Sequence, residues 1–340
     1  TVTVNGKTET LTLVNGKATW IVSGLAAGSY TVSATYSGDT NFTGSTVNAD
    51  FVVSAINPGM NIAVGNTSYG NNATVTVTVN AGATGKVNIT VNGTTHEVDI
   101  VNGKATLVLS GLAAGKYTVS VSYDGNGNFT GADMETDFTV SAINPGMNVA
   151  VGNITYGSNA TAIVTVNTAA TGKVNITVNG KTETVDIVNG QATLVVSGLT
   201  AGDYTVTVSY DGDGNFTAAT ASAIFNVAQI SADMTVDVAN ITYGANATVT
   251  VTVNKQVTGK VNITVNGTTY EVDIVNGKGT LVLSGLAAGS YTVNVKYPGD
   301  GNFEGANATV NFIVSKANPG MNVGVVTSDY GTKANVTVTV

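Results

Sequence analysis

The sequence predicts an all-β protein, a tandem array of seven-stranded antiparallel β-sandwiches with an 87-residue repeat. Three observations predict this fold class. The chain repeats at a fixed step, apolar and polar residues alternate with a period of two inside each repeat, and no segment has the apolar spacing of a helix. A period of 87 residues exceeds the roughly 20–45 residues of a solenoid repeat, so each repeat is expected to be a small domain with its own core.

Recurring residues mark the repeat without any insertion or deletion. Three series share the 87-residue step: Met60, Met147, Met234 and Met321; Tyr30, Tyr117, Tyr204 and Tyr291; and Phe51, Phe138, Phe225 and Phe312. We therefore predict a partial domain at 1–56 with strands three to seven, whole domains at 57–143, 144–230 and 231–317, and a partial domain at 318–340 with strands one and two.

The two partial domains cannot close a core by themselves, because each lacks the strands that the other carries. We expect the chain to be a window on a longer array. The alternative is donor-strand assembly, in which residues 318–340 of one copy complete residues 1–56 of the next.

The strands of one repeat follow in order along residues 57–143. Apolar and polar residues alternate in seven short segments, which include 60–64, 75–79, 87–91, 98–100, 105–109, 117–121 and 138–140. Asn-Gly pairs at 92–93 and 102–103 supply the positive φ angles of type I′ hairpin turns. Seven short strands in about 90 residues are typical of an immunoglobulin-like antiparallel sandwich.

The turn before the sixth strand carries a more specific pattern. Leu112 and Tyr117 flank a Gly-containing turn, where a tyrosine corner would return the hydroxyl to upstream backbone. The string recurs as GLAAGSYTVSATYSGDTNF from Gly24, GLTAGDYTVTVSYDGDGNF from Gly198 and GLAAGSYTVNVKYPGDGNF from Gly285. It resembles the pattern L-x-A-G-x-Y-T-V-x-x-x-Y-x-G-D-x-N-F of the group 3 type of bacterial and archaeal Ig-like repeat domains. The resemblance implies adhesin-like cell-surface proteins of bacteria and methanogenic archaea.

Composition excludes several classes of function. The chain has no Cys and no Arg, and His96 is its one histidine, so the usual side chains of acid–base, phosphate and metal chemistry are nearly missing. Its formal net charge is −8 and no basic cluster is present, which argues against nucleic acid and anionic membranes. No apolar run approaches the length of about 18 residues that a membrane span needs. We predict that the chain is not an enzyme and that no part of this segment enters a membrane.

We predict an extracellular structural protein, a stalk or filament on a prokaryotic cell surface. Its expected partners are neighbouring copies of itself, head to tail. Pro58, Pro145 and Pro319 stiffen the short connections between repeats, so the array is expected to be a rod of roughly 150 Å. The alternative is an adhesin whose repeats or further domains bind host or cell-wall glycans or proteins.

The most frequent chemical motif is the N-x-[ST] sequon, which is an acceptor for N-glycosylation in exported proteins. An Asn- and Thr-rich strand protein also produces this motif by chance. Because the asparagines of the third strand alternate with its core residues, we expect them to face solvent and to accept sugars. The sixteen candidates are Asn41, Asn66, Asn72, Asn88, Asn92, Asn128, Asn153, Asn159, Asn175, Asn215, Asn240, Asn246, Asn262, Asn266, Asn307 and Asn335.

Two acidic loops are candidates for a cation. The loops that begin at Asp124 and Asp211 place oxygen-bearing side chains at alternate positions, as a calcium loop does. Both lack the sixth-position glycine and the closing glutamate of that motif, and Ser37 or Pro298 begins the other two copies. Ordinary Asx-Gly turn chemistry accounts for them without a metal. We predict no cofactor, with calcium at these two loops as the alternative.

A pair of carboxylates could suggest glycoside hydrolysis. Glu97 and Asp99 lie two residues apart on an outward strand face, and Glu271 and Asp273 repeat the pair. A flat outward strand provides no pocket that would raise a carboxyl pKa, so we interpret both pairs as parts of a solvated face. His96 occupies a position that varies between repeats, and we interpret it as a surface residue.

Overall fold

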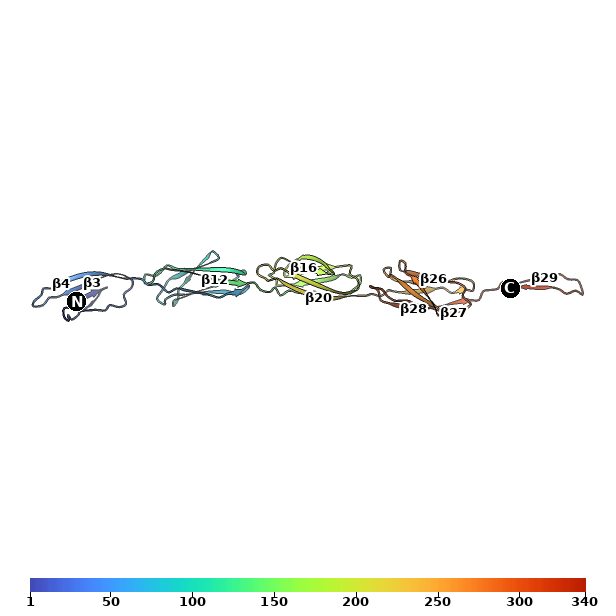
Figure 1. The fold of residues 1–340 in the computed structure, drawn as a ribbon, viewed down its shortest axis with the longest axis horizontal. Helices are drawn as coiled ribbons and strands as arrows, with labels where there is room; N and C mark the ends of the chain where they lie inside the picture. The colour runs from blue at the N-terminus through green and yellow to red at the C-terminus, as the bar shows by residue number, and fades with distance from the viewer. The chain divides into compact units, whose positions relative to one another are not determined.

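The computed structural model describes residues 1–340, and it contains thirty β-strands and no helix (Figure 1). No helix able to cross a membrane is therefore present. Two compact units divide the chain: Thr1–Gly146 with Ala170–Gly172 and Asp211–Ala219, and Met147–Ala169 with Lys173–Tyr210 and Thr220–Val340.

Each whole repeat forms a three-stranded and a five-stranded sheet. In residues 57–143 the sheets run β10-β7-β5 and β6-β12-β11-β8-β9. Their strands are β5 Asn61–Val64, β6 Thr67–Ser68, β7 Ala73–Thr78, β8 Lys86–Val91, β9 Thr94–Asp99, β10 Lys104–Leu109, β11 Gly115–Tyr123 and β12 Ala132–Ser141.

The next two repeats have the same topology. The second has sheets β13-β15-β18 and β14-β20-β19-β16-β17, built from β13 Asn148–Val151, β14 Ile154–Thr155, β15 Ala160–Thr165, β16 Lys173–Val178, β17 Lys181–Asp186, β18 Gln191–Val196, β19 Gly202–Tyr210 and β20 Ala219–Ala228. The third has sheets β21-β23-β26 and β22-β28-β27-β24-β25, built from β21 Thr235–Val238, β22 Ile241–Thr242, β23 Ala247–Thr252, β24 Lys260–Val265, β25 Thr268–Asp273, β26 Lys278–Leu283, β27 Gly289–Tyr297 and β28 Ala306–Ser315.

The structure adds one short strand to the seven predicted per repeat. β6 pairs in parallel with the end of β12, through Thr67 and Val140. Asn66 extends this contact, because its Oδ1 accepts the Thr139 N–H at 2.7 Å. Asn153 and Asn240 make the equivalent bonds at 2.8 and 2.7 Å. Two residues are too few to show an alternating pattern, so periodicity could not predict this strand.

The period-two pattern places the core between the two sheets, as predicted. Val75 and Val77 on β7 and Ile89 on β8 are buried, whereas their neighbours in sequence are not. The predicted hairpin turn is also present, because Asn92 and Gly93 have φ angles of 49° and 76°. At the second turn, a Cβ on Gly103 would lie 2.7 Å from the Val79 carbonyl oxygen, so this turn requires glycine.

The predicted tyrosine corner forms in all copies. Tyr117 Oη donates a hydrogen bond to the Ala113 carbonyl at 3.0 Å, and the ring stacks on Phe138 at a centroid distance of 5.3 Å. The corresponding hydroxyl bonds in the other copies span 2.9–3.0 Å and are made by Tyr30, Tyr204 and Tyr291.

The partial domain at 1–56 has one strand fewer than predicted. It forms β1 Val2–Val4, β2 Lys7–Glu9, β3 Gly28–Tyr36 and β4 Ser45–Val53. The predicted return strand, residues 17–22, is not a strand, and only a single bridge joins Lys17 to Val14. In a whole repeat this strand pairs with β7, and residues 1–56 contain no strand in the phase of β7, so its backbone has no partner.

The partial domain at 318–340 forms the two strands that were predicted. β29 Asn322–Val325 and β30 Val336–Thr339 pair antiparallel. Their apolar side chains are largely exposed, with 64% of Val325 and 51% of Val338 accessible.

Residues 57–143 are expected to fold alone, because every buried residue of their core cluster lies between Met60 and Val140. Circular dichroism should show one cooperative thermal transition. Residues 318–340, a two-stranded hairpin, should remain unfolded under the same conditions. A gradual, non-cooperative transition of residues 57–143 would contradict this prediction.

Leu109→Ala should lower the free energy of unfolding of residues 57–143 by about 2–5 kcal/mol, because it leaves a cavity in the core. Leu109 is 8% exposed. Its neighbour Val108 is 56% exposed, so Val108→Ala should change stability by no more than about 0.5 kcal/mol. Denaturant titration compares the two variants, and equal losses would show that the inward and outward faces are misassigned.

Candidate functional site

The same backbone contacts build three successive connections between repeats. We call each of these connections a joint, which is the short linker together with the loop of the next repeat that the linker contacts. Ile56 donates its N–H to the Asn128 carbonyl at 3.0 Å and accepts the Thr130 N–H at 2.9 Å. Ile143 and Ile230 make the equivalent parallel bridges to Phe216 and Phe303. The atoms of each bridge lie within one compact unit.

An asparagine side chain strengthens each joint. Asn128 Oδ1 accepts the Ala27 N–H at 2.8 Å. Ala27 directly follows Ala26, whose carbonyl oxygen accepts the tyrosine-corner hydroxyl of Tyr30. The same bond joins Asn215 to Ala114 at 2.8 Å and Asn302 to Ala201 at 2.9 Å. The tyrosine corner of one repeat therefore positions the donor that the next repeat binds.

Two aromatic pairs also belong to the joints. Tyr69 meets Phe216 edge to face at a centroid distance of 5.4 Å, and Tyr156 meets Phe303 in the same way at 5.6 Å. Both tyrosines and both phenylalanines recur at the 87-residue step of the sequence. This recurrence indicates that the aromatic positions have a structural role. It could not show that the two rings of a pair come from different repeats.

A carboxylate organises the loop that carries the joint asparagine. Asp300 Oδ1 accepts the N–H groups of Asn302 and Phe303 at 2.8 and 2.9 Å, and Oδ2 accepts from Thr258 at 3.1 Å. Although desolvation acts to raise the pKa of Asp300, these backbone hydrogen bonds outweigh it and hold the pKa below its ordinary value of 3.8. Asn126 occupies the same position in residues 57–143 and accepts the Phe129 N–H at 3.2 Å.

The candidate calcium loops use part of their oxygen donors internally. Asp213 Oδ1 accepts the Asn215 and Phe216 N–H groups, and its Oδ2 accepts from Thr171 at 2.9 Å. No cluster of three or more His, Cys, Asp or Glu residues suited to a metal is formed. The prediction of no cofactor, with calcium at Asp124 and Asp211 as the alternative, is not tested by the structure.

The carboxylate pairs lie on exposed strands, and the glutamate of each pair forms an ion pair. Glu97 contacts Lys86 at 3.0 Å, and Glu271 contacts Lys260 at 3.2 Å. Side chains of this exposure contribute little to stability because solvent screens them. His96 is half-buried, opposite Ile89 on the neighbouring strand.

None of the sixteen sequon asparagines is buried. Five of them already accept a backbone N–H through Oδ1 and so have a structural role: Asn66, Asn153, Asn240, Asn128 and Asn215. Whether any sequon carries sugar stays a prediction.

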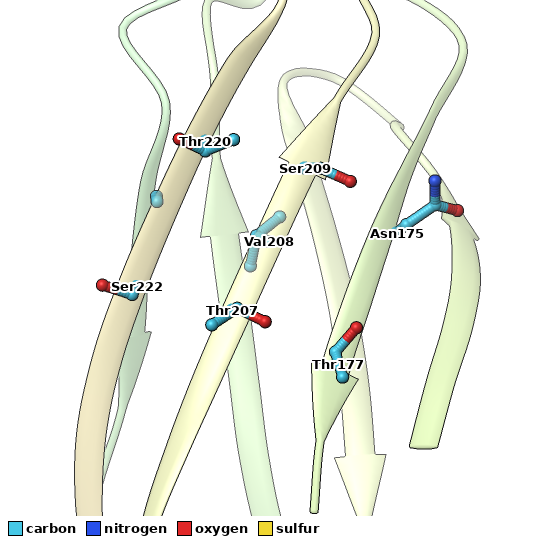
Figure 2. Close-up of a pocket in the computed structure, with 8 residues that line it drawn as sticks. Asn175, Thr177, Thr207, Val208, Ser209, Thr220 and Ser222 are labelled. Carbon is cyan, nitrogen blue, oxygen red and sulfur yellow. The ribbon is translucent and has the colours of Figure 1, made fainter. Parts of the chain in front are cut away.

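The outer face of the five-stranded sheet in the second repeat is hollowed into a groove of about 590 Å³. Three adjacent strands contribute its polar side chains, and none of them is ionisable (Figure 2). They are Asn175 and Thr177 on β16, Thr207 and Ser209 on β19, and Thr220 and Ser222 on β20. The asparagine and the threonine of one sequon, Asn175-Ile176-Thr177, both line the groove.

Comparison with known proteins finds a match to one family. A sequence model described as bacterial Ig-like domain (group 3) matches residues 60–141, 147–228 and 234–315. No curated protein matches the chain significantly.

Several solved structures are similar at low identity. Tandem domains of titin are 14% identical, with 77% of this chain and 100% of that chain covered and a TM-score of 0.36. Immunoglobulin domains 1–5 of Sidekick-1 are 14% identical, with coverages of 93% and 74% and a TM-score of 0.31. Fibronectin(III)-like modules of CbhA from Clostridium thermocellum are 15% identical, with coverages of 50% and 94% and a TM-score of 0.22.

Asn302→Ala should accelerate hydrogen exchange at the Ala201 amide by about two- to tenfold, because that N–H loses its acceptor. Asn302 is not part of a sequon, so sugar cannot confuse the result. Gln256→Ala, at an exposed position of the same repeat, is the control and should leave the amide unchanged. Unaltered protection in Asn302→Ala would show that the side-chain bond does not hold the joint.

Acid should weaken the loop around Asp300. Because folding lowers the pKa of Asp300, its stabilising effect is complete above its unfolded pKa of about 3.9 and is lost as pH falls through the folded value. Asp300→Asn should remove this pH dependence, read as hydrogen exchange at Phe303 between pH 5 and pH 2. The loop of Asn126 is the internal control. Equal acid sensitivity at both loops would contradict the prediction.

Proposed function

Because the chain belongs to the bacterial Ig-like domain (group 3) family, which matches three consecutive segments of it, we propose that it is the stalk or filament of a prokaryotic cell surface. Tandem Ig-like domains are typical of extracellular and surface proteins with structural or adhesive roles, and they are typically not enzymes. In this proposal the repeats act by length and stiffness.

The observation that carries the proposal is the repetition of the joint. At three successive connections the linker isoleucine forms a backbone bridge, and the joint asparagine accepts an alanine N–H at 2.8–2.9 Å. A chain of independent domains on flexible linkers would not need these contacts. Contacts that recur at three successive connections would resist bending, which is what a spacer requires.

We also propose that the partner at each end of the array is a neighbouring copy of the repeat, placed head to tail. Residues 1–56 leave a cleft of about 330 Å³ whose lining includes Val4, Trp20 and Phe51. Strands in the phase of β29 and β30 occupy the equivalent position in whole repeats as β5 and β7. Such strands would fill the cleft, whether they come from the same longer chain or from a separate copy. Mass analysis under denaturing conditions separates the two cases, since a protomer near 34 kDa plus sugar supports separate copies.

N-glycosylation is part of the proposal. The chain has only 10% charged residues, and its sheets present rows of Thr, Ser and Asn to solvent. Such faces have few of the charges that usually prevent sheets from pairing with other chains, and attached sugars would provide a steric barrier instead.

Small-angle X-ray scattering of the whole chain tests the stalk. A stiff array should reach a maximum dimension near the roughly 150 Å expected from strand lengths. Replacing Asn128, Asn215 and Asn302 together by Ala should broaden and shorten the distance distribution. Replacing Asn88, Asn175 and Asn262 by Ala is the matched control, since these asparagines lie outside the joints. A native chain as flexible as the joint variant would overturn the proposal, and specific glycan binding by the repeats would favour the adhesin alternative.

A further inference from the structure

The groove of the second repeat has more unpaired hydroxyl groups than its counterparts. In both counterparts, two positions on neighbouring strands are hydrogen-bonded to each other. In residues 57–143 Ser120 donates to Glu135 at 2.7 Å, and in residues 231–317 Thr309 donates to Asn294 at 2.9 Å. In the second repeat these two positions are Thr207 and Ser222, and neither side chain has a hydrogen-bond partner in the structure.

A second row of cross-strand neighbours in the groove also has unpaired hydroxyl groups. Ser209 lies beside Asn175 in the strand register, and Thr220 completes this row (Figure 2). Neither hydroxyl is paired, and Asp133 occupies the position of Thr220 in residues 57–143. Four unpaired hydroxyls therefore face outward from two adjacent strands, without a nearby charge in the lining.

Asn175 has its amide fixed at the edge of this groove. Thr184 Oγ1 on β17 donates to Asn175 Oδ1 at 2.7 Å, which turns the amide oxygen toward β17. The Nδ2 atom has no hydrogen bond, and Thr177 provides the hydroxyl that the sequon needs.

We propose that Asn175 carries an N-linked neutral saccharide and that the first sugars of this glycan lie in the groove, hydrogen-bonded to Thr207, Ser209, Thr220 and Ser222. The inference rests on the glycosylation proposed above. Attachment forms a bond between a sugar C1 and Nδ2 and breaks the bond from C1 to the pyrophosphate of an activated glycosyl donor, while Nδ2 loses a proton.

The chemistry of the groove suits a tethered neutral sugar. Its hydroxyls can donate to and accept from saccharide hydroxyls, and no carboxylate or ammonium group selects for a charged ligand. The groove has no aromatic side chain on which a sugar ring could stack, so affinity for a free sugar should be weak. Covalent attachment at Asn175 removes this difficulty, because it gives the sugar a high effective concentration at the groove.

Asn88 provides a natural comparison within the same chain. It is the equivalent sequon of residues 57–143, and its groove contains Asp133 and Glu135 in place of Thr220 and Ser222. Because Glu135 already accepts the hydroxyl of Ser120, a glycan on Asn88 finds fewer free partners and should remain mobile.

Periodate oxidation of the native glycoprotein tests the inference, since the reagent cleaves accessible vicinal diols in any glycan that has them. Mass spectrometry of the two glycopeptides gives the occupancy and the oxidation rate at each site. The glycan on Asn175 should be oxidised about fivefold more slowly than that on Asn88, which is the factor expected for one net hydrogen bond. The two rates should become equal after denaturation.

Two substitutions sharpen the test. Ser222→Glu converts the groove to the charged type and should remove the protection at Asn175. Thr193→Asp adds the same charge on the exposed face of β18 and should leave the protection intact.

The outcomes separate this inference from the stalk itself. An Asn175 without sugar, or equal native oxidation rates at Asn175 and Asn88, would overturn the inference, while the scattering result for the stalk would stand. The Asn175→Gln variant carries no sugar at this site. If a free neutral oligosaccharide protects the groove hydroxyls of this variant, the groove binds an external saccharide and not the glycan attached to Asn175, which would overturn the inference.

Discussion

The turn before β3, β11 and β19 fixes both the interior of a repeat and its connection to the next. In residues 57–143 the carbonyl oxygen of Ala113 accepts the tyrosine-corner hydroxyl, which holds β11 against the core. The next N–H, that of Ala114, donates to the joint asparagine, Asn215. Because one short turn serves both purposes, the fold of a repeat and the geometry of the joint are coupled. A change that loosens Tyr117 would also displace the N–H of Ala114.

The three copies of the repeat conserve their interior and differ on their outer faces. Buried positions such as Ile89, Ile176 and Ile263 are identical and fully covered. The outer faces vary in charge, with Glu135 in one copy, Ser222 in the next and Thr309 in the third. The interior is constrained because close packing penalises any change of volume, whereas solvent tolerates most polar substitutions. Differences in chemistry between repeats are therefore expected on the faces.

Charge contributes little to the fold of a repeat or to the joints between repeats. The five ion pairs all join exposed side chains, and no polar or charged residue is buried. Burial of Val and Ile supplies the driving force for folding, while backbone and side-chain amides determine how the repeats are joined. An array held in this way should respond weakly to salt.

Sequence by itself determined the repeat, the alternating strands, the Asn-Gly turns and the tyrosine corner, because each depends on residues that are close in the chain or recur at a fixed step. It could not determine β6, the bond from Asn302 to Ala201 across 101 residues or the pairing of Tyr69 with Phe216. Nor could it predict that residues 17–22 would not form a strand, since that strand depends on a partner outside residues 1–56. These features belong to the tertiary structure, because each is stabilised only when distant segments meet.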